Sequence, residues 1–302
     1  MRGHFNLPVI SYWVWAIRPF SMTASVVPII VGASLSINTA SLNWYLFLAT
    51  LFGSLSIQIA TNLTDEYSDH VRGGSDKKFL APHKVIARGL ISPKSVLKAA
   101  VGSYLLSLIF GFYIFSQTGW PILVFCIPAM IIAILYSAGP IPLGNKGISE
   151  VVVFILMGPA MVMGSYYVQT LELTPRSLLV SLPIGLLVAL IMYCNNLRDL
   201  DEDADSGKTS LASFLGIARA KRTYFMVLCS SYSIIIFSTT LGILSSWALI
   251  SFVSIPLAIR ALKFRFTGSA KGEMNLLMVH TASIHFFTGI GLTIGLLIES
   301  LI

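Results

Sequence analysis

Long apolar runs separated by short polar stretches make up most of the chain. A helix needs about 20 apolar residues to cross the hydrocarbon core of a bilayer. Nine runs come close to this length, and two neighbouring pairs are joined only by very short turns, at Gly119 and Ser245. We therefore expect an all-α polytopic membrane protein with nine transmembrane helices in a single domain over residues 1–302. The predicted spans are 19–38, 43–62, 96–116, 119–138, 148–168, 177–196, 223–243, 245–262 and 277–298.

The composition supports a membrane protein over a soluble one. Only 11% of the residues are charged and 55% are hydrophobic, whereas a soluble domain carries roughly 25% charged residues. A chain so poor in charge cannot cover a surface that faces water, so the surplus apolar surface must face lipid.

The basic residues indicate how the helices are oriented. If the N-terminus lies on the cytoplasmic side, the nine spans put every Lys and Arg except Arg176 on that same side. This is the asymmetry of the positive-inside rule, and it explains the net charge of +7 without a nucleic-acid partner. The N-terminal stretch does not have the form of a cleavable signal. We expect a multi-pass protein of a prokaryotic inner membrane.

The acids are concentrated in two short segments. Of thirteen Asp and Glu residues, four lie between Asp65 and Asp76 and five between Asp199 and Asp205. The first acidic motif (residues 62–69) follows the second predicted span, and the second (residues 195–208) follows the sixth. Each begins with an asparagine at the apolar end of its span and continues into two aspartates four residues apart. Both motifs are expected on the cytoplasmic face.

Aspartates four residues apart share one face of a helix, as Asp65 and Asp69 do, and likewise Asp199 and Asp203. Their charges repel, and a divalent cation with oxygen ligands would offset the repulsion. Mg²⁺ uses one or two carboxylates and leaves its other positions to water and substrate phosphates. One such cluster could equally be a solvated loop end, but two matched clusters favour a function. The four aspartates are therefore predicted to hold Mg²⁺ around a diphosphate and to be catalytic.

Basic residues accompany both motifs. A diphosphate leaving group gains negative charge as its carbon–oxygen bond breaks, and fixed cations aimed at that charge lower the barrier. The apolar spans offer room for an isoprenoid tail and shield a carbocation-like carbon from water. The basic residues in question are Arg72, Lys77, Lys78, Lys84, Arg88, Arg198 and Lys208.

Several segments make the chain similar to the UbiA superfamily of intramembrane prenyltransferases, and most to its menaquinone branch, the 1,4-dihydroxy-2-naphthoate polyprenyltransferases. The most specific is NNLRDLDED at 195–203 followed by GKTSLA. The others are Arg18-Pro19, NLTDEYSD at 62–69, RGLIS at 88–92, YSAGPIPLG at 136–144, ISEVVVFILMGPAMVMGSYYVQT at 148–170 and TASIHFFTGIGL at 281–292.

The resemblance implies nine helices around a central cavity, with both motifs on cytoplasmic loops. It implies that a polyprenyl group passes from its diphosphate to an aromatic acceptor that loses its carboxylate. Asp65, Asp69, Asp199 and Asp203 would carry Mg²⁺ and the diphosphate, with Asn62 and Asn195 orienting them. The expected phosphate contacts are Arg72, Lys84, Arg88, Arg198 and Lys208.

One position departs from the branch pattern, which often has Asn where this chain has Asp65, with an acid next, here Glu66. Either residue could be the acid on the metal side, although the spacing to Asp69 favours Asp65.

Other functions remain open at this stage. The acceptor could instead be 4-hydroxybenzoate, homogentisate, haem or a glycerol-phosphate lipid. A cation-coupled transporter would need acids deep within several spans, which are nearly free of charge, and a scaffold gives no reason for matched acid pairs. Prenyl chain length and oligomeric state are not encoded in any recognisable motif.

Overall fold

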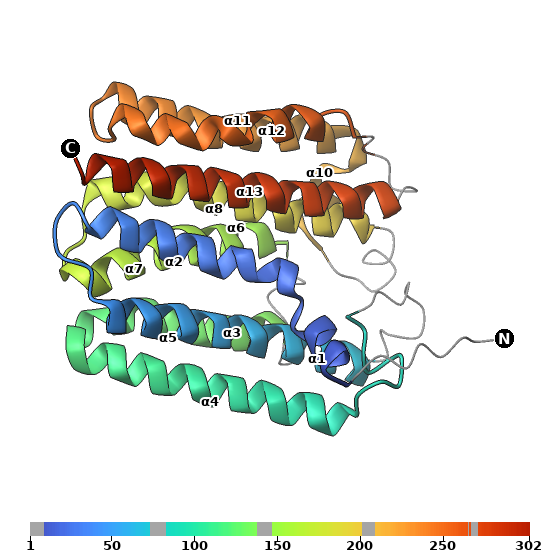
Figure 1. Cartoon of the computed structure of the whole chain (residues 1–302). Helices are drawn as coiled ribbons and strands as arrows, with labels where there is room; N and C mark the ends of the chain where they lie inside the picture. Colours follow the sequence, from blue (N-terminus) through green and yellow to red (C-terminus); the bar gives the residue numbers. More distant parts are fainter. Residues whose placement is uncertain (1–8, 73–82, 138–146, 201–208, 265, 267–270) are drawn as a thin grey trace.

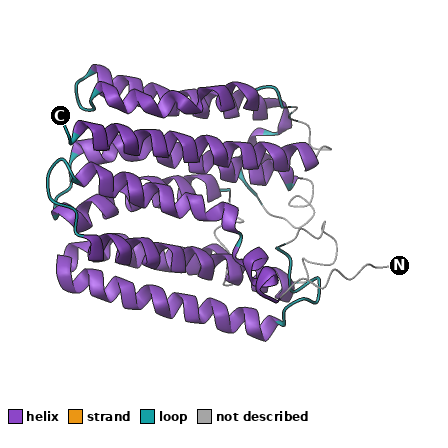
Figure 2. Cartoon of the chain, in the orientation of Figure 1, coloured by secondary structure: helices purple, strands orange, loops and turns teal. Residues whose placement is uncertain are grey.

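The computed structural model describes residues 9–72, 83–137, 147–200, 209–264, 266 and 271–302. The secondary-structure elements within these ranges are helices, as predicted (Figure 2). Seven helical segments are long and apolar enough to cross a membrane: Pro19–Ser36, Trp44–Val71, Pro93–Thr118, Ser149–Thr170, Pro175–Arg198, Ile217–Thr240 and Gly272–Glu299. Two shorter apolar segments, Trp120–Tyr136 and Ser246–Ala261, occupy the other two predicted positions.

The long helices run side by side with roughly parallel axes, and α1 and the end of α13 lie at opposite ends of the bundle (Figure 1). In chain order the elements are α1 (Val9–Ile17), η1 (Pro19–Met22), α2 (Thr23–Ser36), α3 (Trp44–Val71), α4 (Pro93–Thr118), η2 (Trp120–Ile122), α5 (Leu123–Ser137), α6 (Ser149–Ile155), η4 (Leu156–Ala160), α7 (Met161–Thr170), α8 (Pro175–Arg198), α10 (Leu211–Leu215), α11 (Ile217–Thr240), η5 (Ser246–Ser254), α12 (Ile255–Ala261) and α13 (Lys271–Glu299).

Helix α3 is longer than the predicted span, which ended at residue 62. It continues to Val71, because no glycine or proline interrupts the chain between Ser54 and Arg72. The expectation that the first acidic motif lies on a loop is therefore wrong. Asp65 and Asp69 lie on the helix itself, one turn apart.

Glycines allow several helices to cross at backbone distance. A Cβ on Gly291 would lie 2.5 Å from the Cα of Ser251, and one on Gly295 would lie 2.4 Å from the carbonyl oxygen of Trp247. The spacing of these glycines, four residues apart, indicates close helix packing, and the structure confirms this: α13 packs directly on η5.

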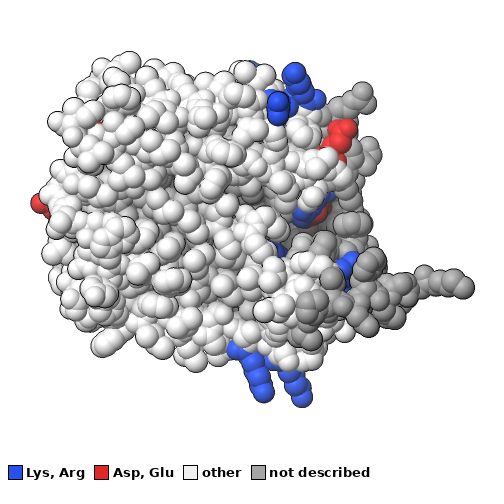
Figure 3. All heavy atoms as spheres, viewed as in Figure 1, with Lys and Arg blue, Asp and Glu red and all other residues white. Residues whose placement is uncertain are grey.

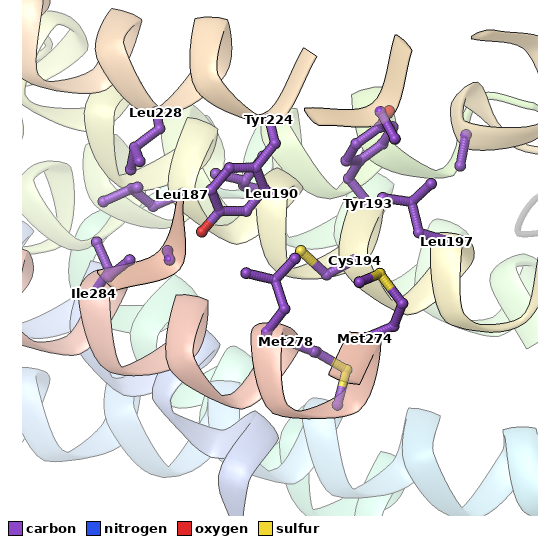
Figure 4. Close-up of a cluster of buried hydrophobic side chains, with 14 of the residues drawn as sticks. Leu187, Leu190, Tyr193, Cys194, Leu197, Tyr224, Leu228, Met274, Met278 and Ile284 are labelled. Atoms are coloured by element: carbon purple, nitrogen blue, oxygen red, sulfur yellow. The ribbon is translucent and has the colours of Figure 1, made fainter. Parts of the chain in front are cut away.

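A buried cluster fixes the position of α8, which carries the start of the second motif. Figure 4 shows Leu187, Leu190 and Cys194 of α8 packed between side chains of α11 and α13. Tyr224 of α11 is fully buried, and its hydroxyl lies 2.9 Å from that of Thr281 on α13. The end of α8 is thus held by two neighbouring helices.

The charged side chains are unevenly distributed over the surface. In Figure 3 the long sides of the bundle are almost free of Lys, Arg, Asp and Glu, which gather toward the end where α1 lies. Arg176 lies in the first turn of α8 and Arg198 is its last residue, so these two arginines lie at opposite ends of the bundle. Arg176 pairs with Glu299 of α13 at 2.5 and 2.6 Å.

Candidate active site

A cavity of about 1330 Å³ lies inside the bundle. One face of α3 lines it from end to end, because the lining positions recur every three or four residues. The face extends from Thr50 to Arg72, about 33 Å at the rise of an α-helix. Most of the cavity wall is apolar, and its charged side chains lie at one end. The residues of α3 that line it are Thr50, Gly53, Ser54, Ile57, Gln58, Thr61, Asn62, Asp65 and Asp69, and Arg72 follows directly after the helix.

The two acidic motifs meet at the charged end of this cavity. Asp65 and Asp69 reach it from α3, and Asn195 and Asp199 reach it from the end of α8. The predicted residues Asp203 and Lys208 lie outside the described residues.

Asp65, Asp69 and Asp199 are each paired with a basic side chain. Arg18 donates to Asp65 at 2.8 Å, and Lys84 pairs with Asp69. Arg198 donates to both carboxylate oxygens of Asp199, from Nε at 2.9 Å and from Nη2 at 2.7 Å. Of the predicted phosphate contacts, Lys84, Arg72 and Arg198 line the cavity.

Arg18 was not among the predicted site residues. Its backbone has a φ of 56°, in the left-handed region that non-glycine residues seldom occupy and that often marks functional sites. Asn62 holds this segment over α3, because its side-chain amide donates to the carbonyl of Ile17 at 2.8 Å and to the hydroxyl of Ser21 at 3.0 Å. Asn62 thus positions the cation that pairs with Asp65.

Glu66 is not among the residues that line the cavity. Its side chain is 2% exposed, and its carboxylate accepts a hydrogen bond from the backbone amide of Ile86 at 3.0 Å and lies 3.6 Å from the Lys84 ammonium. Glu66 therefore anchors the segment that supplies Lys84. This geometry favours Asp65 over Glu66 as the acid on the metal side.

A second polar network supports the end of α8. Asn195 accepts from Arg198 at 2.8 Å, while Asn196 donates to Glu150 at 2.8 Å and to Ser149 at 3.1 Å. Glu150 is buried and also accepts from the backbone amide of Leu211 at 3.3 Å. The sequence analysis did not identify this network. Its signal in the sequence is Glu150, an acid at the very start of an apolar segment.

Arg88 is not among the residues that line the cavity, in contrast to the other described basic candidates. Its guanidinium carbon lies 6.0 Å from the ring centroid of Trp15, which does line it. The contact is of the cation–π type. Arg88 therefore contacts a residue of the cavity wall without lining the cavity itself.

His83 is a further lining residue that the sequence did not indicate. Burial lowers its pKa to about 2, with smaller contributions from the positive charges of Arg18 and Lys84. Its imidazole is therefore neutral at physiological pH in the ligand-free protein.

The donor set fits a magnesium–diphosphate complex. Among the described residues, no three His, Cys, Asp or Glu side chains are close enough to form a metal site by themselves. Mg²⁺ is characteristically bound through one or two carboxylates together with water and substrate phosphates. The aspartates of α3 on one side and Asp199 on the other would supply the carboxylates.

Comparison with known proteins assigns the family. The profile of the UbiA prenyltransferase family matches residues 25–285. The chain belongs to this family. A 1,4-dihydroxy-2-naphthoate octaprenyltransferase of Bacillus subtilis is 34% identical, over 93% of this chain and 91% of the relative. The protein of the same name from Mycobacterium leprae is 31% identical, over 83% of this chain and 84% of the relative.

Solved structures share the fold of this UbiA protein. A digeranylgeranylglyceryl phosphate synthase has a TM-score of 0.66 at 15% identity, covering 96% of this chain and 99% of the other. A UbiA homolog from Archaeoglobus fulgidus bound to GPP and Mg²⁺ has a TM-score of 0.61 at 15% identity, covering 93% and 99%. The sequence-based predictions of a UbiA prenyltransferase and of a multi-pass membrane protein are confirmed.

Proposed function

We propose that this UbiA enzyme transfers a polyprenyl group from polyprenyl diphosphate to 1,4-dihydroxy-2-naphthoate, with Mg²⁺ as cofactor, and that the acceptor loses its carboxylate to give demethylmenaquinone in its reduced, hydroquinone form. The observation that carries the proposal is the convergence of Asp65, Asp69 and Asp199 at the charged end of a long apolar cavity. The names of the relatives from two bacteria support the choice of acceptor.

The ion pairs at this end suit the binding of a diphosphate. Arg18, Lys84 and Arg198 each neutralise a carboxylate in the ligand-free protein. A bound diphosphate would offer its oxygens to these three cations, and Asp65, Asp69 and Asp199 would then be available to hold Mg²⁺. Bound Mg²⁺ would supply positive charge that stabilises the leaving diphosphate.

The chain's own residues then favour departure of the diphosphate. As the carbon–oxygen bond of the donor breaks, its electron pair stays with the diphosphate, where Arg18, Lys84 and Arg198 stabilise the charge. The apolar wall excludes water from the positive carbon that remains. The ring carbon that bears the acceptor's carboxylate forms the new bond to this carbon. The carboxylate leaves as CO₂, and its bonding electrons restore the aromatic ring.

The membrane arrangement follows from the same features. We propose that the whole chain is one domain, that the two shorter apolar segments cross the bilayer with the seven longer ones, and that the charged end faces the cytoplasm. The position of Arg198 at this end and of Arg176 at the other supports this orientation. The enzyme would lie in the inner membrane, and no nucleic acid is involved.

The test is an assay in membranes that contain the unmodified protein. Geranylgeranyl diphosphate is offered with dihydroxynaphthoate, 4-hydroxybenzoate or homogentisate, with and without Mg²⁺. We expect prenylated, decarboxylated product from dihydroxynaphthoate only, and only with Mg²⁺. Transfer to one of the other acceptors instead would reject the proposed substrate while leaving the family assignment intact.

A further inference from the structure

Five side-chain amides line the cavity, and one of them lies away from its charged end. The other four hydrogen-bond to neighbouring residues close to that end: Asn62, Asn195, Asn196 and Asn275. The fifth is Gln58. It lies seven residues before Asp65 on α3, about 10 Å deeper along the helix axis.

One end of the Gln58 amide is held by the protein. Ser25 of α2 is 1% exposed, and its hydroxyl donates to Oε1 of Gln58 at 3.1 Å. In the part of the chain that the structure describes, the NH₂ group of Gln58 donates to no acceptor. A side-chain amide offers two donors and two acceptor positions, and it loses free energy where they stay unpaired in apolar surroundings. Gln58 therefore presents polar atoms that a bound molecule can satisfy.

The wall around this amide is otherwise suited to an apolar ring. Helices α3 and α8 both run toward the charged end, so Met192, seven residues before Asp199, lies at about the depth of Gln58. Val188 and Ile191 of α8 line the cavity beside Met192. An isoprenoid tail has no atom that can pair with an amide. An aromatic acceptor has apolar faces and also carries oxygen atoms at its edge.

The proposed acceptor has an oxygen in the right place. Its reacting ring carbon must meet the donor carbon and therefore lies near the charged end of the cavity. Of the two ring hydroxyls, the 1-hydroxyl is beside this carbon, whereas the 4-hydroxyl is across the ring from the 1-hydroxyl and can reach deeper. A hydroxyl both donates and accepts, so it can pair with either end of the amide.

We propose that Gln58 hydrogen-bonds the 4-hydroxyl of 1,4-dihydroxy-2-naphthoate and makes the enzyme select acceptors that carry a hydroxyl at this position. The inference rests on the proposed function, for which it names a specificity-determining residue. An acceptor without this hydroxyl leaves the amide unpaired in an apolar wall, and the site discriminates against it for that reason.

The test uses 1-hydroxy-2-naphthoate, which lacks only the 4-hydroxyl. This group is meta to the reacting carbon, so its removal leaves most of the carbon's nucleophilicity. In membranes, kcat/KM is measured with both acceptors for the unmodified protein, Gln58→Met and Thr50→Val. Gln58→Met keeps the length of the side chain and removes its polar atoms. Thr50 also lines the cavity on α3, but its hydroxyl already donates to the carbonyl of Leu46 at 2.8 Å.

We expect the unmodified protein to prefer dihydroxynaphthoate. Gln58→Met should lower this preference about tenfold or more, through loss with dihydroxynaphthoate alone, and Thr50→Val should retain it. If the unmodified protein does not prenylate the analogue, the preference is measured from its inhibition constant as a competitor of dihydroxynaphthoate.

An unchanged preference in Gln58→Met, or an equal loss with both acceptors, would overturn the role of Gln58. If that variant fails to fold, Ser25→Ala releases the amide from α2 and must lower the preference in the same direction; a retained preference there would also overturn it. Absence of transfer to dihydroxynaphthoate by the unmodified protein would instead be a failure of the proposed function.

Discussion

The guanidinium of Arg18 donates a 2.8 Å hydrogen bond to the carboxylate of Asp65, although the two residues are 47 positions apart in the chain. Arg18 precedes the first predicted span, and Asp65 lies near the end of the second long helix. The pair therefore assembles only when the bundle folds, and it brings a cation to the charged end of the cavity.

Arg18→Gln is expected to lower kcat/KM for the prenyl diphosphate by about a hundredfold or more, because a fixed charge aimed at the leaving group is lost. The control is the double variant Arg176→Gln, Glu299→Gln, which removes the ion pair at the other end of the bundle. Both proteins are assayed in membranes with saturating acceptor. Equal losses in the two would mean that the effect of Arg18 is on the fold alone.

Asp65→Asn and Asp199→Asn are each expected to abolish prenyl transfer while the protein still inserts and folds. Each change removes a carboxylate charge from one side of the cavity, while the new side chain has the same size and shape as the old one. Product is measured by chromatography, and folding by thermal unfolding in detergent. Full activity of both variants would eliminate the proposed mechanism.

Glu66→Gln is expected to act mainly on stability. Its carboxylate is buried against Ile86 and Lys84, and weakening a buried charged hydrogen bond costs about 1–3 kcal/mol. The variant should unfold at a lower temperature and keep the wild-type dependence of its rate on Mg²⁺ concentration. A shifted Mg²⁺ dependence would instead make Glu66 the acid on the metal side.

Removal of Mg²⁺ with a chelator is expected to stop the reaction and leave the helices folded. The ion pairs of Asp65, Asp69 and Asp199 neutralise these carboxylates without metal. Circular dichroism should be unchanged by chelation, and activity should return when Mg²⁺ is added. A helical signal that disappears with the metal would contradict this account.

Gly295→Leu is expected to destabilise the protein by about 1–3 kcal/mol, because the new side chain must displace the backbone of η5. Gly102→Leu is the matched control, since nothing lies near its Cβ. Thermal unfolding of the two variants in the same detergent gives the comparison. Similar stability of both would show that α13 and η5 can move apart freely.

The apolar helices and the end of the bundle that carries the candidate site could be predicted from the sequence, because both depend on local pattern. Apolar length determines the spans, and the spacing of Asp65 and Asp69 places both on one helix face. The predicted second span ended at residue 62, whereas α3 continues to Val71. The lack of glycine and proline between Ser54 and Arg72 is the sequence feature that indicates this longer helix.

The partners of the acids could not be predicted in this way. Arg18, His83 and Glu150 acquire their roles from contacts between elements distant in the chain, and no local pattern specifies such contacts. The direction of Glu66 depends likewise on the segment around Ile86 that folds against α3.

Helix α3 is unbroken from the cavity's far end to its acids, and this has a consequence for how related enzymes could change their substrates. The distance from the charged end to any side chain of α3 that projects into the cavity is measured along one rigid helix, in turns of about 5.4 Å. Replacing a small residue by a large one at successive turns would shorten that distance by one turn at a time. Donor length would then change in discrete steps while the chemistry at the other end stayed the same.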